Sequence, residues 1–232
     1  MNNIAQSFAP WCQTLAAGLT LTLASGALQA ATLQVIVVDR NGTPAYDAVV
    51  VVVPAAPGAA KSPPPLLATV NQEKMQFVPA VTVLSPGGKV RFSNSDAWDH
   101  HVRLSEPTLT SGVASGRGAE AFSLRLAGKN EGKPATFAEV TLDKPGEYGA
   151  ALLSCLIHGS MSGHVYVAES PWAVKTDVNG IATFNDLPDG AATVKVWHAA
   201  QLLVKPLVPV TLSATPTQTS VQLDVQMRRK RL

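Results

Sequence analysis

The chain has 232 residues, of which 46% are hydrophobic and 15% are charged, and its 18 basic and 16 acidic residues give a formal net charge of +2. This balance excludes a nucleic-acid binder that relies on phosphate neutralisation, and the apolar content excludes a disordered chain. The 17 prolines and 17 glycines argue against a helical bundle. Sparse aromatic residues and plentiful valines and threonines favour an all-β fold of one or two domains.

The first 30 residues indicate an export signal. Residues 1–30 carry no charged side chain, and residues 15–28 form an apolar stretch of the length typical of a signal-peptide core. Cleavage is expected after Ala30, which would place the mature protein in the periplasm. An uncleaved membrane anchor fits less well, because the stretch is short and contains Thr, Ser and Gly. No other segment is long and apolar enough to cross a bilayer, so we expect no membrane span in the mature chain.

Runs rich in β-forming residues follow in chain order, separated by turn signals. Strands are expected at 32–38, 48–53, 75–83, 89–93, 121–126, 140–142, 148–154 and 163–168, with a proline-rich linker at 55–70 and a surface loop at 106–118. A second block begins near Trp172, with strands expected at 181–184, 191–197, 207–212 and 220–227. The basic tail, 228–232, is interpreted as a solvated segment, with electrostatic contact to an acidic partner as the alternative.

Removal of the export signal would take away Cys12 and leave Cys155 as the single cysteine of the mature chain. A cysteine without a disulfide partner is unusual in an oxidising compartment, so the presence of Cys155 has to be explained. Around it the sequence reads Cys155-Leu-Ile-His158-Gly-Ser-Met161, a short loop between two expected strands. Upstream, His100 and His101 stand where another strand is expected to leave the sheet, and in a sandwich they could lie beside that loop.

A thiolate, two imidazoles and a thioether form a soft, mixed set of donors. Calcium and magnesium prefer oxygen ligands, and structural zinc normally takes four ligands from Cys and His. One Cys, two His and one Met suit copper in a trigonal site with a weak axial thioether. Taken singly, these residues have ordinary explanations as a buried thiol, a surface histidine or a core methionine, and their conjunction predicts the metal site. For His164 and His198, on expected strands, we expect structural roles.

Between residues 71 and 168 several motifs share a known spacing: Met75-Gln-Phe-Val-Pro79, Gly88-x-Val90-x-Phe92-x-Asn94, His100-x-Val102, Pro145-Gly146 and Cys155-x2-His158-x2-Met161. They resemble those of cupredoxins, the blue-copper domains of plastocyanin and amicyanin, and the wider arrangement resembles bacterial methylamine-utilisation-type plastocyanin-like proteins. The resemblance implies one type 1 copper with His100, Cys155 and His158 as equatorial ligands and Met161 as the axial ligand. The six-residue spacing from Asn94 selects His100, and His101, which stands where small cupredoxins usually carry Asn, remains the alternative ligand.

The flanking segments share a second pattern. Residues 34–50 and 176–190, each with an Asp-x-Asn-Gly turn, resemble the opening and the continuation of a carboxypeptidase regulatory-like (transthyretin-like) sandwich. We therefore expect an all-β chain in which a Greek-key cupredoxin sandwich at 71–168 is inserted in, or joined to, a second β-sandwich. That second sandwich would be discontinuous, made of residues 31–54 and 173–227.

These features predict an exported one-electron carrier that meets other redox proteins through small, transient contacts. An enzyme is not expected, because four ligands leave no open position for a substrate. Two alternatives stay open at this stage. One is a periplasmic protein that binds and delivers copper without a place in a redox chain. The other is a cell-envelope interaction module in which the metal site has a structural role.

Overall fold

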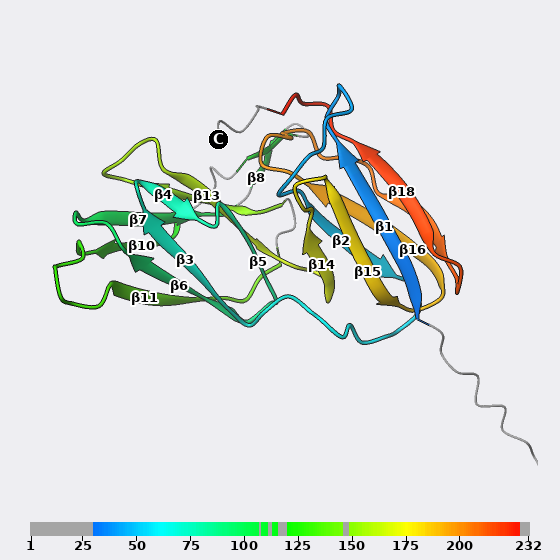
Figure 1. The fold of residues 1–232 in the computed structure, drawn as a ribbon, viewed down its shortest axis with the longest axis horizontal. Helices are drawn as coiled ribbons and strands as arrows, with labels where there is room; N and C mark the ends of the chain where they lie inside the picture. The colour runs from blue at the N-terminus through cyan, green and yellow to red at the C-terminus, as the bar shows by residue number, and fades with distance from the viewer. Residues whose placement is uncertain (1–29, 107, 111–112, 116–119, 146–148, 228–232) are drawn as a thin grey trace, which may run out of the picture.

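The structure is a computed structural model, and it describes residues 30–106, 108–110, 113–115, 120–145 and 149–227. These residues form strands, turns and loops arranged as several sheets (Figure 1), which confirms the all-β fold. No helix in this part of the chain has the length and hydropathy needed to cross a membrane. The expected export signal, apart from Ala30, and the basic tail lie outside the described residues.

Residues 67–167 supply two packed sheets, drawn at the left of Figure 1. One has the strand order β10 (Glu120–Leu126), β7 (His100–Ser105), β12 (Ala151–Cys155), β13 (Ser162–Val167), β5 (Val81–Leu84). The other has the order β11 (Thr136–Leu142), β6 (Gly88–Asn94), β3 (Leu67–Glu73), β4 (Gln76–Val78). Buried apolar side chains fill the space between them, among them Val70, Phe92, Leu104 and Leu153. On β10 the expected alternation is confirmed, since Phe122, Leu124 and Leu126 face this core while their neighbours are exposed.

A second pair of sheets lies at the right of Figure 1. Its strand orders are β15 (Ile181–Leu187), β1 (Ala31–Val38), β18 (Thr217–Gln222) and β14 (Trp172–Lys175), β2 (Val49–Pro54), β16 (Gly190–Trp197), β17 (Val208–Leu212). The two strands that precede residue 55 thus pair with strands that follow residue 171: β1 with β15 and β18, and β2 with β14 and β16. Leu33, Val35, Val50 and Phe184 belong to the core of this pair.

Several elements differ from the sequence-based expectation. The strand expected at 75–83 is divided into β4 and β5 around Pro79, which has no backbone N–H to donate to a ladder. The expected linker at 55–70 overlaps β3, because Leu67 begins a parallel ladder with β6. The loop expected at 106–118 contains a small hairpin of β8 (Thr108–Thr110) and β9 (Val113–Ser115). Strand β18 ends at Gln222, although the expected alternation of burial continues to Met227.

A third core joins the two pairs of sheets. Val49 and Val51 of β2 pack with Val81 of β5 and Tyr166 of β13, and all four side chains are buried. The alternate valines of β2 point into the core of the second pair of sheets, so both faces of this strand are buried. A strand buried on both faces is typically an unbroken apolar run, which accounts for the four consecutive valines at 49–52, whereas Val53 is 43% exposed.

Two histidines lie beside this third core. The His164 ring, on β13, meets the Trp197 ring edge-on with 5.2 Å between centroids. Burial, with a smaller contribution from nearby His198, lowers the pKa of His164 to about 4. Burial also lowers the pKa of His198, although a hydrogen bond to the Tyr46 backbone opposes the shift. Both rings are therefore neutral at pH 7.

We expect the free energy of unfolding to fall as the pH drops from about 6.5, the usual pKa of histidine, towards 4. In this window the unfolded state binds a proton at His164 that the folded state excludes. The loss from this residue amounts to about 2 kcal/mol at pH 5. Urea unfolding at about pH 7.5 and about pH 5 measures it. The His164→Gln variant should lose less stability between these pH values than the wild type, and an equal loss in both would contradict the assignment.

Candidate metal centre

Antiparallel pairing brings two of the expected ligands to the same edge of a sheet. Cys155 is the last residue of β12, and His100 is the first residue of β7. These strands are antiparallel neighbours with Cys155 opposite Val102. The N–H of Leu156 donates to the backbone oxygen of His101 at 3.0 Å, which extends the pairing past the thiol. The end of one strand and the start of the other therefore coincide.

The loop that follows Cys155 carries the other two expected ligands. It connects β12 to β13, and the N–H of Met161 donates to the backbone oxygen of His158 at 3.0 Å, closing a tight turn. Met161 is 2% exposed and packs in the same core cluster as Cys155. His158 is half-buried, while the two residues before it are exposed. The turn thus holds a thioether inside the protein and an imidazole at its surface.

Three donor atoms converge at this edge. Sγ of Cys155 lies 3.7 Å from Nδ1 of His100 and 3.6 Å from Nδ1 of His158, and the two Nδ1 atoms are 3.1 Å apart. The point equidistant from the three atoms lies about 2.0 Å from each of them, which is a metal–nitrogen bonding distance. Among the His, Cys, Asp and Glu side chains of the described residues, these three form a group whose donor atoms are close enough together to hold a metal ion.

His101 lies apart from this group. Side chains alternate across a strand, so adjacent residues of β7 face opposite ways. The Nε2 atom of His101 is 2.7 Å from the Ser123 hydroxyl on β10, whereas the His100 ring is fully buried beside Cys155. Of the histidine pair, the structure brings His100 to the thiol and not His101.

A buried carboxylate fixes the orientation of the His100 ring. Oδ2 of Asp96 lies 2.9 Å from Nε2 of His100, and the Asp96 side chain is 6% exposed. Asp96 also accepts the backbone N–H groups of Lys74 and Met75, at 2.7 and 3.0 Å. Because an ionised carboxylate accepts but does not donate, Nε2 of His100 carries the proton and the Nδ1 lone pair faces Cys155. An outer carboxylate of this kind orients a metal-binding histidine and raises its basicity.

The ionisation of Asp96 follows from the same contacts. Burial raises the pKa of this carboxyl, but hydrogen bonds from the Met75 backbone, the His100 ring and the Lys74 backbone outweigh it and hold the pKa below its usual 3.8. Sequence reasoning missed Asp96. Its one local signal is an acidic residue four positions before a histidine, which is too common to select it.

Asn94 secures the loop that precedes His100. Its amide nitrogen donates to the backbone oxygens of Trp98, Leu126 and Ala127 at 2.8, 3.3 and 3.1 Å, and its side-chain oxygen accepts the N–H of Asp96 at 3.0 Å. The buried amide thus ties loop 95–99 to the end of β10. Asn94, whose spacing from His100 selected that histidine as the ligand, therefore also braces this loop.

The same loop is braced from its outer side. Asp99 pairs with Arg125 and accepts the N–H of Gly128 at 2.8 Å. A Cβ atom at position 128 would lie 2.3 Å from the backbone oxygen of Ala97, so the close approach of the two chains requires glycine. The two contacts hold the loop that leads to His100 against β10, through Arg125, and against the chain that follows β10, through Gly128.

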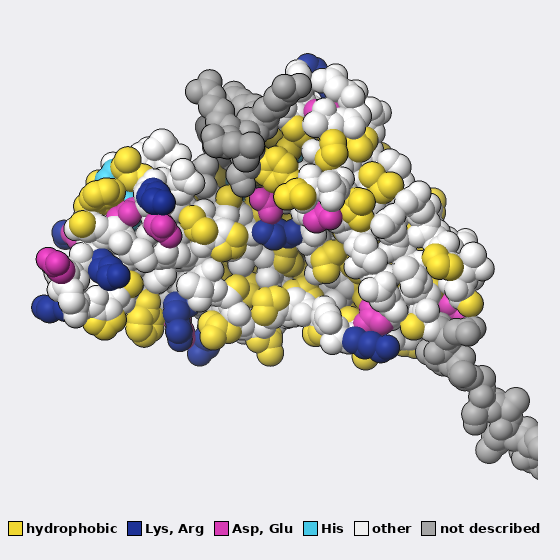
Figure 2. Space-filling model, in the orientation of Figure 1, with side chains coloured by type: hydrophobic (Ala, Val, Ile, Leu, Met, Phe, Trp, Pro, Cys, Tyr) yellow, Lys and Arg dark blue, Asp and Glu magenta, His cyan; other side chains and the backbone are white. Residues whose placement is uncertain are grey.

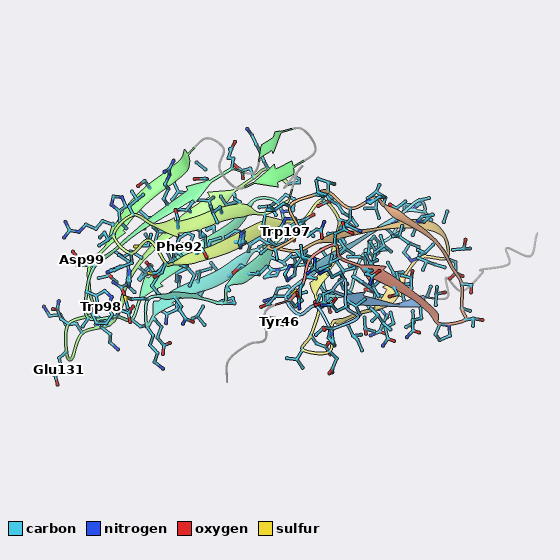
Figure 3. All side chains as sticks on the ribbon, turned by 90° about the horizontal axis from the view of Figure 1, so that it is seen from above. Tyr46, Phe92, Trp98, Asp99, Glu131 and Trp197 are labelled. Carbon is cyan, nitrogen blue, oxygen red and sulfur yellow. The ribbon has the colours of Figure 1, made fainter. Side chains whose placement is uncertain are left out.

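The centre lies at one end of the molecule. Figure 3 places Trp98 and Asp99 at the end remote from Trp197 and Tyr46, which lie near the junction of the two pairs of sheets. Trp98, Leu156 and Ile157 are 46%, 54% and 53% exposed, and all three lie in the loops that carry the site. The half-buried His158 is thus set among exposed apolar side chains, while His100 is closed off from solvent.

The donor set fits copper better than the other common metals. One thiolate and two imidazole nitrogens, with a thioether packed nearby, are soft ligands of the kind that copper takes in trigonal sites. A hard cation would find no cluster of oxygen donors among these three residues. Held in this way, copper would supply a one-electron change between Cu(I) and Cu(II).

Comparison with known proteins identifies the family of this half of the molecule. Residues 65–168 match the family model described as copper binding proteins, plastocyanin/azurin family. This segment is a cupredoxin domain. Its cofactor is copper, and the chain is a copper-binding protein. The family match begins close to β3, in agreement with the strand's start at Leu67.

Solved structures were compared as well. Amicyanin from Paracoccus versutus (Thiobacillus versutus) is 22% identical, covers 51% of this chain and 96% of its own, and has a TM-score of 0.30. A purple cupredoxin from Nitrosopumilus maritimus is 15% identical, covers 44% of this chain and 99% of its own, and has a TM-score of 0.30. No curated protein matches the chain.

We expect Asp96→Asn to weaken copper binding about 10- to 100-fold. The amide keeps one oxygen acceptor in place of two, and it removes the negative charge beside the His100 ring. Competition with a Cu(I) chelator measures the affinity. Glu139→Gln, which alters a carboxylate paired with Arg91 on the other cupredoxin sheet, is the matched control and should bind copper like the wild type. Equal affinity in Asp96→Asn and the control would contradict the role assigned to Asp96.

Proposed function

We propose that Cys155, His100 and His158 are the equatorial ligands of one type 1 copper, that Met161 is its axial ligand, and that the protein is an exported one-electron carrier. The observation that carries the proposal is the convergence of one sulfur and two Nδ1 atoms around a single point, next to a buried methionine. The thiolate, and not the thiol, is the form that binds, so loading the site releases the Cys155 proton.

The surroundings favour electron transfer over metal exchange. His100 is fully buried and hydrogen-bonded to Asp96, and loop 95–99 is braced by Asn94. A site held this firmly needs little rearrangement when the charge of its metal changes. His158 is the half-buried ligand, and the exposed Trp98, Leu156 and Ile157 give its surroundings an apolar surface suited to brief contacts with other redox proteins.

The two alternatives make different demands on the site. A copper-delivery protein needs ligands that release the metal readily, and the buried His100 and Met161 argue against this. An interaction module with a structural metal would not need a ligand at the surface, where His158 lies. An enzyme is not favoured, because the four proposed ligands leave no open position for a substrate.

Export is part of the proposal. It rests on the uncharged, apolar residues 1–30 and on the single cysteine that remains after cleavage behind Ala30. A copper-bound thiolate explains how that cysteine persists in the periplasm without a disulfide partner.

We further propose that residues 31–54 and 173–227 form one discontinuous β-sandwich domain into which the cupredoxin domain is inserted. The pairing of β1 and β2 with strands beyond residue 171, and a core separate from that of the cupredoxin sheets, support this division. The likeness of this sandwich to carboxypeptidase regulatory-like domains remains a prediction.

The purified protein should take up one copper and show an intense visible thiolate-to-copper band that disappears on reduction. Electron self-exchange between oxidised and reduced protein, followed by NMR line broadening, should be fast, and the copper should resist a chelator through many redox cycles. Cys155→Ser should lose the band, because a serine hydroxyl supplies no thiolate, while its circular dichroism stays that of the wild type.

Two results would speak against the carrier. Slow self-exchange together with ready transfer of copper to a chelator would favour delivery. A colourless copper complex in the wild type would contradict the ligand set itself. Met161→Leu serves as a second variant, because it should keep the band and raise the midpoint potential through loss of the thioether donor.

Limited proteolysis tests the discontinuous domain. Cleavage between residues 55 and 66, a segment without strands, should leave the 31–54 fragment bound to the remainder in native buffer, because β1 and β2 are held by β14, β15, β16 and β18. Gel filtration without denaturant followed by mass spectrometry gives the answer. Separation of that fragment under native conditions would contradict the arrangement.

A further inference from the structure

The two pairs of sheets meet at a junction that contains a titratable ring. On the cupredoxin side, His164 and Tyr166 of β13 lie on the outer face of their sheet, away from the core that includes Cys155. Trp197 of β16, labelled in Figure 3, meets both rings from the other side, with centroid distances of 5.2 Å to His164 and 6.0 Å to Tyr166. A histidine is thus part of the surface that holds the two pairs of sheets together.

Side chains also make the polar contacts across this junction. Lys175 of β14 donates to the backbone oxygen of Val81 on β5 at 2.8 Å and pairs with Asp47 at 2.9 Å. Lys195 of β16 pairs with Glu169, which follows β13, at 2.7 Å. Figure 2 shows acidic and basic side chains close together where the two pairs of sheets meet. Among the described strands none forms a ladder from one pair of sheets to the other, so separating them would break no strand pairing.

A second histidine, His198, follows β16 next to Trp197. It is 7% exposed, and its Nδ1 atom accepts the N–H of Ala200 at 3.1 Å. Because a backbone N–H only donates, this nitrogen is unprotonated and the ring is neutral. A proton gained at Nδ1 would break the hydrogen bond to Ala200. The contacts of this ring thus hold only while it is neutral.

The groups that face these two rings do not favour a positive charge. β5 and β12, which flank β13, contain no charged residue, and neither does β2 across the junction. β14 and β16 contribute two lysines, and each is paired with a carboxylate: Lys175 with Asp47 and Lys195 with Glu169. His198 disfavours a proton on His164, while Asp47 favours one on His198 but less strongly than burial opposes it. Tyr166 stays neutral, because burial raises the pKa of its phenol.

We propose that His164 and His198 make this junction acid-sensitive, so that protonation of the two rings separates the cupredoxin domain from the second pair of sheets while each stays folded. Separation gives both rings access to water, in which a charged imidazole is well solvated. Burial holds the pKa of His164 at about 4 in the joined state, against about 6.5 for a free histidine. Acid therefore favours the separated state. Each pair of sheets keeps its own core, so separation need not unfold either of them.

The metal centre lies outside this switch. Cys155 and Met161 pack in the core of the cupredoxin sheets, on the face of the sheet opposite to the His164 ring. Figure 3 shows Trp98 at the end of the molecule remote from Trp197. Acid separation therefore does not rest on the proposed redox role, and it would leave the copper ligands in place.

Cleavage by a glutamate-specific protease measures the separation in the intact, copper-loaded protein. Glu169 lies in the segment that connects the two pairs of sheets, between Ala168 and Ser170, which are 1% and 6% exposed. A protease binds several residues on both sides of its cleavage site, so it reaches Glu169 only when the junction opens. Glu139, in the ladder of β11 with β6, becomes accessible when the cupredoxin sheets open. Glu131, exposed in the loop after β10, is the internal standard for protease activity at each pH.

We expect the rate of cleavage after Glu169, divided by the rate after Glu131, to rise about 30-fold between about pH 7.5 and about pH 5 from the His164 proton alone. Cleavage at a transiently opened site follows the population of the open state. The rate after Glu139 should remain below the rate after Glu169 at both pH values, and the copper band should persist. The double variant His164→Gln, His198→Gln should lose most of the rise, because glutamine forms hydrogen bonds but gains no charge.

His101→Gln is the matched control and should show the rise of the wild type. It removes a histidine of the same sheet whose ring bonds to Ser123, on β7, which β12 separates from β13. Circular dichroism shows that each variant is folded, and the single variant His164→Gln, which keeps only the contribution of His198, serves where the double variant does not fold.

The proposal is overturned by the absence of a rise in the wild type or by an unchanged rise in the double variant. Equal rates after Glu169 and Glu139 would overturn it as well, since both sites would then open only on unfolding. A protein that lacks the copper band and still shows the rise would refute the redox proposal and leave this one standing.

Discussion

The antiparallel pairing of β7 with β12 is the constraint on which the metal centre depends. It sets His100, at the start of one strand, beside Cys155, at the end of the other. A loop of six residues must then return the chain to β13, and a loop this short cannot carry His158 and Met161 far from the thiol. Three of the four proposed ligands thus share one turn, and the fourth is a strand neighbour. A shift of one residue in this register would turn His100 outwards and His101 inwards.

The parts of the site that could be predicted from the sequence are those whose residues lie close together along the chain. The spacing Cys155-x2-His158-x2-Met161 is readable because one turn contains it. The choice between His100 and His101 is not local, since it depends on which face of β7 meets the core and which meets Ser123 of β10. Asp96 could not be predicted, because its partners Lys74 and Met75 come from a turn more than twenty positions upstream.

The fold shows the same division. The alternation of apolar and polar residues, together with the turn residues, predicted most strands. It did not predict the start of β3 at Leu67, because this strand is formed by pairing with β6, which is distant in sequence. The valines at 49–53 indicated a strand without showing why all four residues from 49 to 52 are apolar. The structure supplies the reason: Val50 and Val52 face one core, and Val49 and Val51 face another. Removing the cupredoxin sheets would expose Val49 and Val51 of β2, so contact with those sheets stabilises the second pair.

The buried carboxylate next to His100 would have an electrostatic consequence for a site that changes charge, as the proposed electron-carrier role requires. With the thiolate counted, a Cu(II) centre is one unit more positive than a Cu(I) centre. Asp96 adds a negative charge 2.9 Å from the His100 ring, in a region from which solvent is excluded, and there it acts more strongly than it would in water. Because a fixed negative charge favours the more positive state, Asp96 would stabilise an oxidised centre relative to a reduced one. In the proposed role, positioning of the ring and adjustment of the redox balance would thus be two effects of a single side chain.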